Sequence, residues 1–86
     1  MKIIYLKNET YNKQNRYSYC IKILSNGSTI DCDGEKISTD TFDGSLDEEV
    51  LSYTECLFFK LVEATKEEFD FLFKKTVKRI NSLSNI

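Results

Sequence analysis

The sequence contains no histidine, no proline and no tryptophan, and only three glycines among its 86 residues. Without histidine, this chain alone cannot build a histidine-ligated zinc site or use an imidazole for acid–base catalysis. The three cysteines, Cys20, Cys32 and Cys56, are odd in number and widely spaced, which makes a poor disulfide framework and a poor zinc signature. We therefore expect reduced, partly buried thiols, and neither a metal nor another cofactor.

Further absences concern membranes and catalysis. No apolar run approaches the roughly 20 residues that a membrane-spanning helix needs, and Met1–Leu6 is too short for the apolar core of a secretory signal. We expect a soluble, cytoplasmic protein. The sequence also lacks a glycine-rich phosphate loop and a nucleophile elbow, and so small a chain rarely encloses a catalytic pocket. We therefore expect that the protein is not an enzyme.

The chain has enough apolar residues to form one folded domain, residues 1–86. Hydrophobic residues make up 41% of it, and six phenylalanines and five tyrosines supply large side chains for a core. A chain of this length buries roughly 60–65% of the surface that it exposes when unfolded, which is enough for one modest core. This composition argues against intrinsic disorder.

Charge is divided unevenly along the chain. Residues 31–49, called the acidic segment below, hold eight acids and one base, a net charge of −7. Because the whole chain carries −2, the remaining residues sum to +5. The eight acids are Asp31, Asp33, Glu35, Asp40, Asp43, Asp47, Glu48 and Glu49. Two opposed fields of this kind bear on the choice of partners and on encounter rates, not on the fold.

Alternating apolar residues and turn dipeptides predict an antiparallel sheet. The predicted strands are Met1–Lys7, Tyr17–Leu24, Ser28–Cys32, Glu35–Thr39 and Tyr53–Glu63. The dipeptides Asn26-Gly27 and Asp33-Gly34 favour the positive φ angles of two-residue hairpin turns, so the middle of the chain is predicted to be a meander. The residues predicted to share the buried face of the second strand are Tyr17, Tyr19, Ile21 and Ile23.

Capping residues predict one long helix and one short helix. Thr65 as N-cap, with Glu68 three residues later, forms a capping box before an amphipathic helix of about 18 residues. Its apolar stripe consists of Phe69, Leu72, Phe73, Thr76, Ile80 and Leu83. Ser45 and Glu48 form a second box, which allows a short helix within residues 41–52. The predicted fold is α+β: four or five antiparallel strands, the C-terminal helix across one face, and the other face open or covered by a second copy.

The acidic segment has three possible interpretations. Thr29–Asp40, which overlaps its start, partly follows a calcium-binding EF-hand loop, but the first and last ligand positions do not fit and no helices flank it, so we expect a hairpin turn there. Its acids are also consistent with a solvated strand edge that discourages pairing between sheets. Alternatively, they form a negative surface that docks on a basic groove of another protein, even one that normally holds phosphates.

A second candidate surface is basic and aromatic. Phe71 lies opposite the apolar stripe of the long helix, among lysines, which is out of pattern for an exposed helix face. Aromatic rings beside cations are how single-stranded nucleic acids are often held. The residues of this alternative are Tyr5, Tyr11, Arg16, Phe71, Lys74, Lys75 and Lys78. Phe71 or an open sheet face is equally consistent with a homodimer contact.

The layout of a sheet followed by a C-terminal helix, with strand, turn and helix over Phe58–Phe71, broadly resembles single repeats of the Pur-type nucleic-acid-binding domains. The likeness covers the layout and carries no residue roles. In size and texture the chain is also similar to small acidic proteins of phages and of toxin–immunity pairs. The leading hypothesis is a non-enzymatic protein that binds a basic protein partner through its acidic segment, for example an inhibitor or anti-defence factor of a phage or mobile element.

Overall fold

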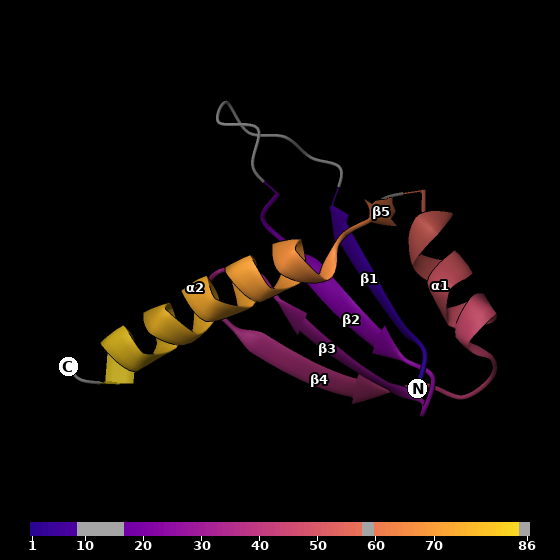
Figure 1. The fold of residues 1–86 in the computed structure, drawn as a ribbon, viewed down its shortest axis with the longest axis horizontal. Coiled ribbons are helices and arrows are strands. Elements are labelled where there is room, and N and C mark those ends of the chain that lie inside the picture. The colour runs from indigo at the N-terminus through magenta and orange to yellow at the C-terminus, as the bar shows by residue number, and fades with distance from the viewer. Residues whose placement is uncertain (9–16, 58–59, 85–86) are drawn as a thin grey trace.

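The computed structural model describes residues 1–8, 17–57 and 60–84, which form an antiparallel sheet with two helices. In chain order the elements are β1 (Ile3–Asn8), β2 (Cys20–Leu24), β3 (Ser28–Cys32), β4 (Ile37–Thr41), α1 (Leu46–Thr54), β5 (Leu61–Glu63) and α2 (Lys66–Ser84). The strands lie in the order β4-β3-β2-β1-β5, and α2 crosses the sheet (Figure 1). The predicted α+β class is therefore confirmed, with a five-stranded antiparallel sheet and a C-terminal helix across it.

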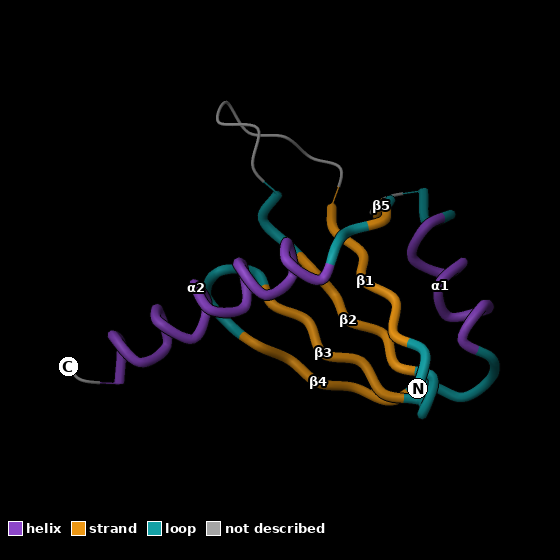
Figure 2. Tube along the Cα trace, viewed as in Figure 1, coloured by secondary structure: helices purple, strands orange, loops and turns teal. Residues whose placement is uncertain are grey.

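Short loops connect β2, β3 and β4. Figure 2 shows β2, β3 and β4 following one another through brief connections. Gly27 and Gly34, in the two predicted turns, have φ angles of 93° and 92°, which few other residues tolerate. The predicted meander is thus formed and β3 has the predicted bounds. The loops are longer than the predicted two residues, because Leu24 pairs with Ser28 and Cys32 pairs with Ile37.

Alternate strand residues face two separate hydrophobic clusters, one under each helix. The buried residues of the first cluster are Leu6, Ile21, Ile23 and Leu61, with Leu46, Val50 and Tyr53 of α1 packed against them. The second cluster joins Cys20 and Cys32 of the sheet to Phe69 and Leu72 of α2. The two sides of the sheet are called the α1 face and the α2 face below. The sequence predicts that this face is open or covered by a second copy; α1 packs on it at β2 and β5 and so covers part of it.

Two sequence predictions about local structure are wrong. In the predicted strand Tyr53–Glu63, Tyr53 and Thr54 belong to α1 and Leu61–Glu63 form β5, while residues 58–59 lie outside the described residues. The helix includes Tyr53 because Leu46, Val50 and Tyr53 follow helical spacing and pack together on the first cluster. Tyr17 does not share a face with Tyr19, because it precedes β2 and packs on the α2 side, while Tyr19 packs on the α1 side.

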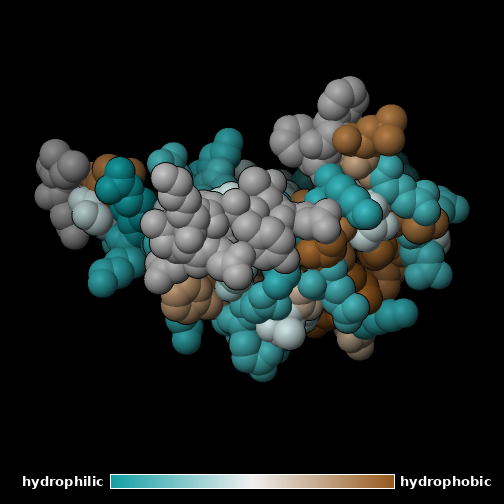
Figure 3. All heavy atoms as spheres, turned by 90° about the horizontal axis from the view of Figure 1, so that it is seen from above, coloured by the Kyte–Doolittle hydropathy of each residue, from teal (hydrophilic) through white to brown (hydrophobic). Residues whose placement is uncertain are grey.

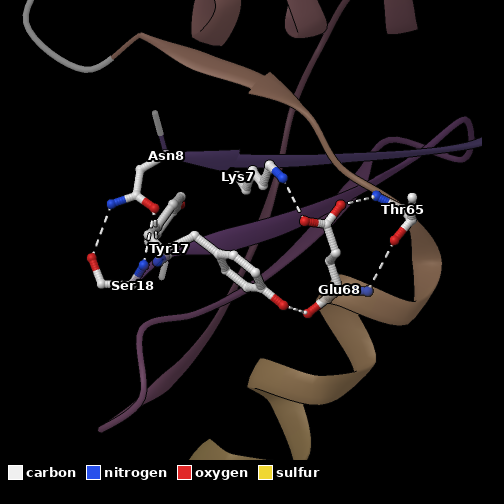
Figure 4. A network of polar contacts seen from close by, with 7 residues as sticks. Lys7, Asn8, Tyr17, Ser18, Thr65 and Glu68 are labelled. Carbon is white, nitrogen blue, oxygen red and sulfur yellow. Dashed lines mark hydrogen bonds and ion pairs between the residues drawn. The ribbon is translucent and has the colours of Figure 1, made fainter. Parts of the chain in front are cut away.

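The N-terminus of α2 is fixed by the predicted capping box. The amide of Glu68 donates to Thr65 Oγ1 at 3.1 Å, and the amide of Thr65 donates back to Glu68 Oε1 at 2.9 Å. Glu68 also pairs with Lys7 of β1, and the Tyr17 hydroxyl donates to the main-chain oxygen of Glu68 at 2.7 Å (Figure 4). These contacts attach the start of α2 to the end of β1.

The other end of α2 extends past the sheet (Figure 1). Phe69, Leu72 and Thr76 are buried against the strands, whereas Ile80 and Leu83 on the same stripe are 36% and 48% exposed. The predicted apolar stripe therefore covers the sheet only along its first part.

Candidate functional site

The strand register places two acids of the acidic segment on the α1 face. Asp31 of β3 pairs with Ile21, and Asp40 of β4 pairs with Thr29. Directly opposed residues of antiparallel strands point to the same side, and Ile21 belongs to the cluster under α1. Asp31 and Asp40 are thus diagonal neighbours on the part of this face beside α1.

Three carboxylates from three elements converge on Tyr53 of α1. The pKa of Tyr53 is raised, most of all by burial. The charge and hydrogen bond of Glu49 raise it further, and the charges of Asp31 and Asp40 add smaller contributions. An upward shift of a phenol pKa by neighbouring carboxylates means that the local field is negative. The fold therefore gathers Asp31, Asp40 and Glu49, which are spread over 19 positions of the acidic segment.

Tyr19 ties one of these acids to the end of the sheet. Its hydroxyl donates a hydrogen bond of 2.7 Å to Asp31 Oδ2. Burial first, and then this hydrogen bond and the charge of Asp31, raise the pKa of Tyr19 well above its ordinary value. Its hydroxyl remains a donor at every physiological pH.

A cavity of about 730 Å³ opens next to Tyr19 and Tyr53, between the end of the sheet and the C-terminal end of α1. Its described lining residues are Asn8, Ser18, Tyr19, Asp33, Glu35, Ser52, Tyr53, Cys56, Lys60 and Leu61. In Figure 3, which looks onto this end of the molecule, hydrophobic atoms are visible on the side that carries α1, surrounded by hydrophilic ones. Two more acids of the acidic segment, Asp33 and Glu35, thus lie at a concave surface.

The turn that carries these two acids is held from inside the protein. Asp33 Oδ1 accepts hydrogen bonds from the amides of Glu35 and Lys36, both at 2.9 Å, which is why β4 begins at Ile37 and not at the predicted Glu35. Burial acts to raise the pKa of Asp33, but these amide hydrogen bonds outweigh it and leave the pKa lowered.

Buried Thr76 of α2 anchors the same turn from below. The Gly34 amide donates to Thr76 Oγ1 at 3.0 Å, and that hydroxyl donates to the Leu72 main-chain oxygen at 2.7 Å. Thr76 is fully buried, so its bond to Leu72 is shielded from water, while the bond from Gly34 is partly buried.

The remaining acids flank this arrangement. The first turn of α1 contains Asp47, Glu48 and Glu49, where the helix dipole favours negative charge. The Ser45 hydroxyl caps this turn by accepting a hydrogen bond of 3.1 Å from the Glu48 amide. Asp43 is exposed in the connection from β4 to α1. Among residues 1–8, 17–57 and 60–84, the ion pairs are Lys7–Glu68 and Lys66–Asp70, so no acid of the acidic segment is paired with a described cation.

The described residues of the basic alternative are only partly gathered. Phe71 is 62% exposed on α2, where Lys74, Lys75 and Lys78 are exposed too. Tyr5 lies under α2 instead, with its ring 5.6 Å from that of Phe69. Tyr11 and Arg16 fall outside the described residues.

Two of the three cysteines are buried in the sheet. Cys20 and Cys32 face each other across β2 and β3 as buried thiols, and burial raises their pKa to about 12 and about 11. In the part of the chain that the structure describes, no three acid or cysteine side chains are placed to hold a metal ion. No helix in that part is long and apolar enough to cross a membrane.

Sequence reasoning missed the two tyrosines that organise the site. The strand pattern predicts Tyr19 as a core residue, which its packing on the first cluster bears out, but it gives no sign of the bond to Asp31, and it predicts Tyr53 as part of a strand. The available signal for Tyr53 was its spacing from Leu46 and Val50, which places all three on one side of a helix. Lys60, the described cation of the cavity lining, had no signal, since its position depends on how the chain returns from α1 to β5.

Comparisons with protein-family models, with curated proteins and with solved structures find no match for this chain.

Proposed function

We propose that this protein is a non-enzymatic interaction protein that binds a protein partner through the acidic segment. The observation that carries the proposal is the convergence of Asp31, Asp40 and Glu49 on Tyr53, with no ion pair to a described cation. Like charges held together repel one another and lower the stability of the fold. A cationic surface placed against them relieves that repulsion and gains from complementary charge.

The distribution of bases supports a directional encounter. The exposed lysines Lys74, Lys75 and Lys78 lie on α2, on the opposite side of the sheet from the α1 face. A molecule with one negative side is steered toward a positive surface and is repelled from a negative one. A groove that normally holds phosphates is one such surface, and an inhibitor that occupies it, as in an anti-defence factor of a phage or mobile element, is one form of the proposal.

The test is a variant in which the negative field is removed without changing side-chain shape. It carries Asp40→Asn, Asp43→Asn, Asp47→Asn and Glu49→Gln, all outside the cavity lining. Wild type and variant are immobilised and exposed to an extract of the source cell at about 50 mM salt. Proteins that bind there and are released at about 200 mM are identified, and their affinities for both forms are measured. We expect the affinity of the variant for the partner to be about tenfold lower than that of the wild type, and its binding to depend less on salt.

The matched control carries Lys74→Gln, Lys75→Gln and Lys78→Gln on the opposite side, and it should retain the affinity of the wild type. Circular dichroism checks that both variants are folded. Equal affinity of the acidic-segment variant and the wild type for every captured protein would refute the proposed function.

A second candidate function, binding of single-stranded nucleic acid, is favoured by one observation: Phe71 is 62% exposed beside exposed lysines. The test is binding of a fluorescent oligonucleotide at about 50 and 200 mM salt. Under this alternative, binding is tight at the lower salt, falls steeply at the higher, and is lost in a Phe71→Ala variant. Absence of binding at the lower salt removes it.

A further inference from the structure

Several hydrogen-bond donors that line the cavity beside Tyr19 and Tyr53 already have acceptors within the protein. The Tyr19 hydroxyl donates to Asp31, and the Asn8 side-chain amide donates to Ser18 Oγ at 2.9 Å. The Ser52 hydroxyl donates to the main-chain oxygen of Glu49 at 2.6 Å. Apart from Lys60, a ligand that needs donors from this lining finds few.

Acceptors remain available at the same surface. Asp33 uses Oδ1 for the two amides of its turn, so its other oxygen has no hydrogen bond among the described residues. The carboxylate of Glu35 is exposed and likewise has no described hydrogen bond or ion pair. Both side chains are acceptors only when ionised, and the lowered pKa of Asp33 keeps it so.

The walls of the cavity are partly aromatic and apolar. The half-buried side chains of Tyr19 and Tyr53 line it together with buried Leu61. Aromatic faces attract cations, and carboxylates accept their hydrogen bonds. Of the cationic side chains, the guanidinium group fits best, because it is planar, stacks on rings and has five donors for several acceptors.

We propose that this cavity receives an arginine side chain of the protein partner, with Asp33 and Glu35 accepting its hydrogen bonds and Tyr19 and Tyr53 lining its planar faces. This inference rests on the proposed function and names the chemistry of the partner at that surface. The volume of about 730 Å³ accommodates the side chain with part of its flanking peptide. Lys60 in the lining opposes the guanidinium charge, so its removal should strengthen binding.

The experiment uses a short capped peptide, acetyl-Gly-Arg-Gly-amide, and its citrulline counterpart, which has the same shape without the charge. Binding to the full chain is followed by NMR through the ring signals of Tyr19 and Tyr53. We expect saturable shifts with the arginine peptide and about tenfold weaker binding of the citrulline peptide. Glu35→Gln should weaken binding of the arginine peptide several-fold, and Lys60→Met should strengthen it.

The opposite signs of these two variants separate a specific site from a loss of folding, which would weaken binding in both. Equal affinity for the arginine and citrulline peptides, or an unchanged affinity in Glu35→Gln, would overturn the inference. If the peptide fails to bind while the acidic-segment variant still loses its partner, the cavity inference alone is wrong. If that variant keeps its partner, the proposed function fails whatever the peptide does.

Discussion

At the scale of single residues, Thr76 has an unusual position for a polar side chain. It lies on the apolar stripe of α2, is fully buried, and bonds both Leu72 of its own helix and Gly34 of the turn below. A buried hydroxyl with both bonds made links two elements that are far apart in sequence. The position of Asp33 and Glu35 at the cavity thus depends on a residue on the opposite face.

We predict that Thr76→Val lowers the free energy of unfolding by about 0.5–1.5 kcal/mol, because the partly buried Gly34 amide loses its hydrogen-bond partner. Thr76→Ser, which keeps the hydroxyl, should cost less. Urea unfolding followed by circular dichroism measures both. If Thr76→Val were as stable as the wild type, the Gly34 hydrogen bond would contribute nothing to the fold.

Glu68 gives the protein a predictable dependence on pH. Burial acts to raise the pKa of Glu68, but the hydrogen bonds from Lys7 and Thr65 outweigh it, so its pKa lies below the ordinary 4.5. A carboxyl group whose pKa is lower in the folded state stabilises that state fully above its unfolded pKa, and this contribution is lost as the pH falls through the folded value.

We therefore predict that the wild type loses more stability than Glu68→Gln when the pH falls from neutral to below 4.5, whereas above that range the wild type is the more stable of the two. Subtracting the two unfolding curves removes the contributions of Asp33 and Asp70, whose pKa values are also lowered. Parallel curves over the whole pH range would contradict a structural role for this ion pair.

At the scale of elements, the local signals were reliable and the non-local ones were not. The Thr65 capping box forms as predicted, and the turns lie at the predicted glycines although their loops hold more than two residues. The extent of α1 and β5 was not predictable, because the packing of α1 against distant strands decides it. The acids of the site were evident from their number, but their convergence on Tyr53 depends on strand register and on helix docking.

The end of α2 that extends past the sheet should contribute little to stability. Ile80 and Leu83 remain 36% and 48% exposed, whereas Leu72, on the part of α2 that covers the sheet, is 4% exposed. We predict that ending the chain after Arg79 lowers the free energy of unfolding by about 1 kcal/mol or less, while Leu72→Ala lowers it by about 2–5 kcal/mol. Denaturant unfolding of both variants tests this contrast. A truncation as costly as Leu72→Ala would mean that the extending end is packed in solution.

At the scale of the whole molecule, the separation of charge should make stability depend on salt. The acids of the α1 face repel one another, and added salt screens that repulsion. We predict that Asp40→Asn is more stable than the wild type by about 0.2–1 kcal/mol at low salt and equal to it at high salt. Asp70→Asn is the control, because Asp70 is paired with Lys66 and its loss should not stabilise the fold. Thermal unfolding at several salt concentrations measures both variants.

The strand order also has a consequence for how the chain folds during synthesis. The first strand made, β1, ends up inside the sheet, between β2 and β5, and its partner β5 is the last strand made. The hairpins of β2, β3 and β4 are local and close early, whereas the pairing of β1 with β5 must close a loop that holds most of the chain. Until β5 leaves the ribosome, one edge of β1 stays unpaired and open to other chains. The nascent protein is therefore most vulnerable to aggregation just before its last strand and helix are completed.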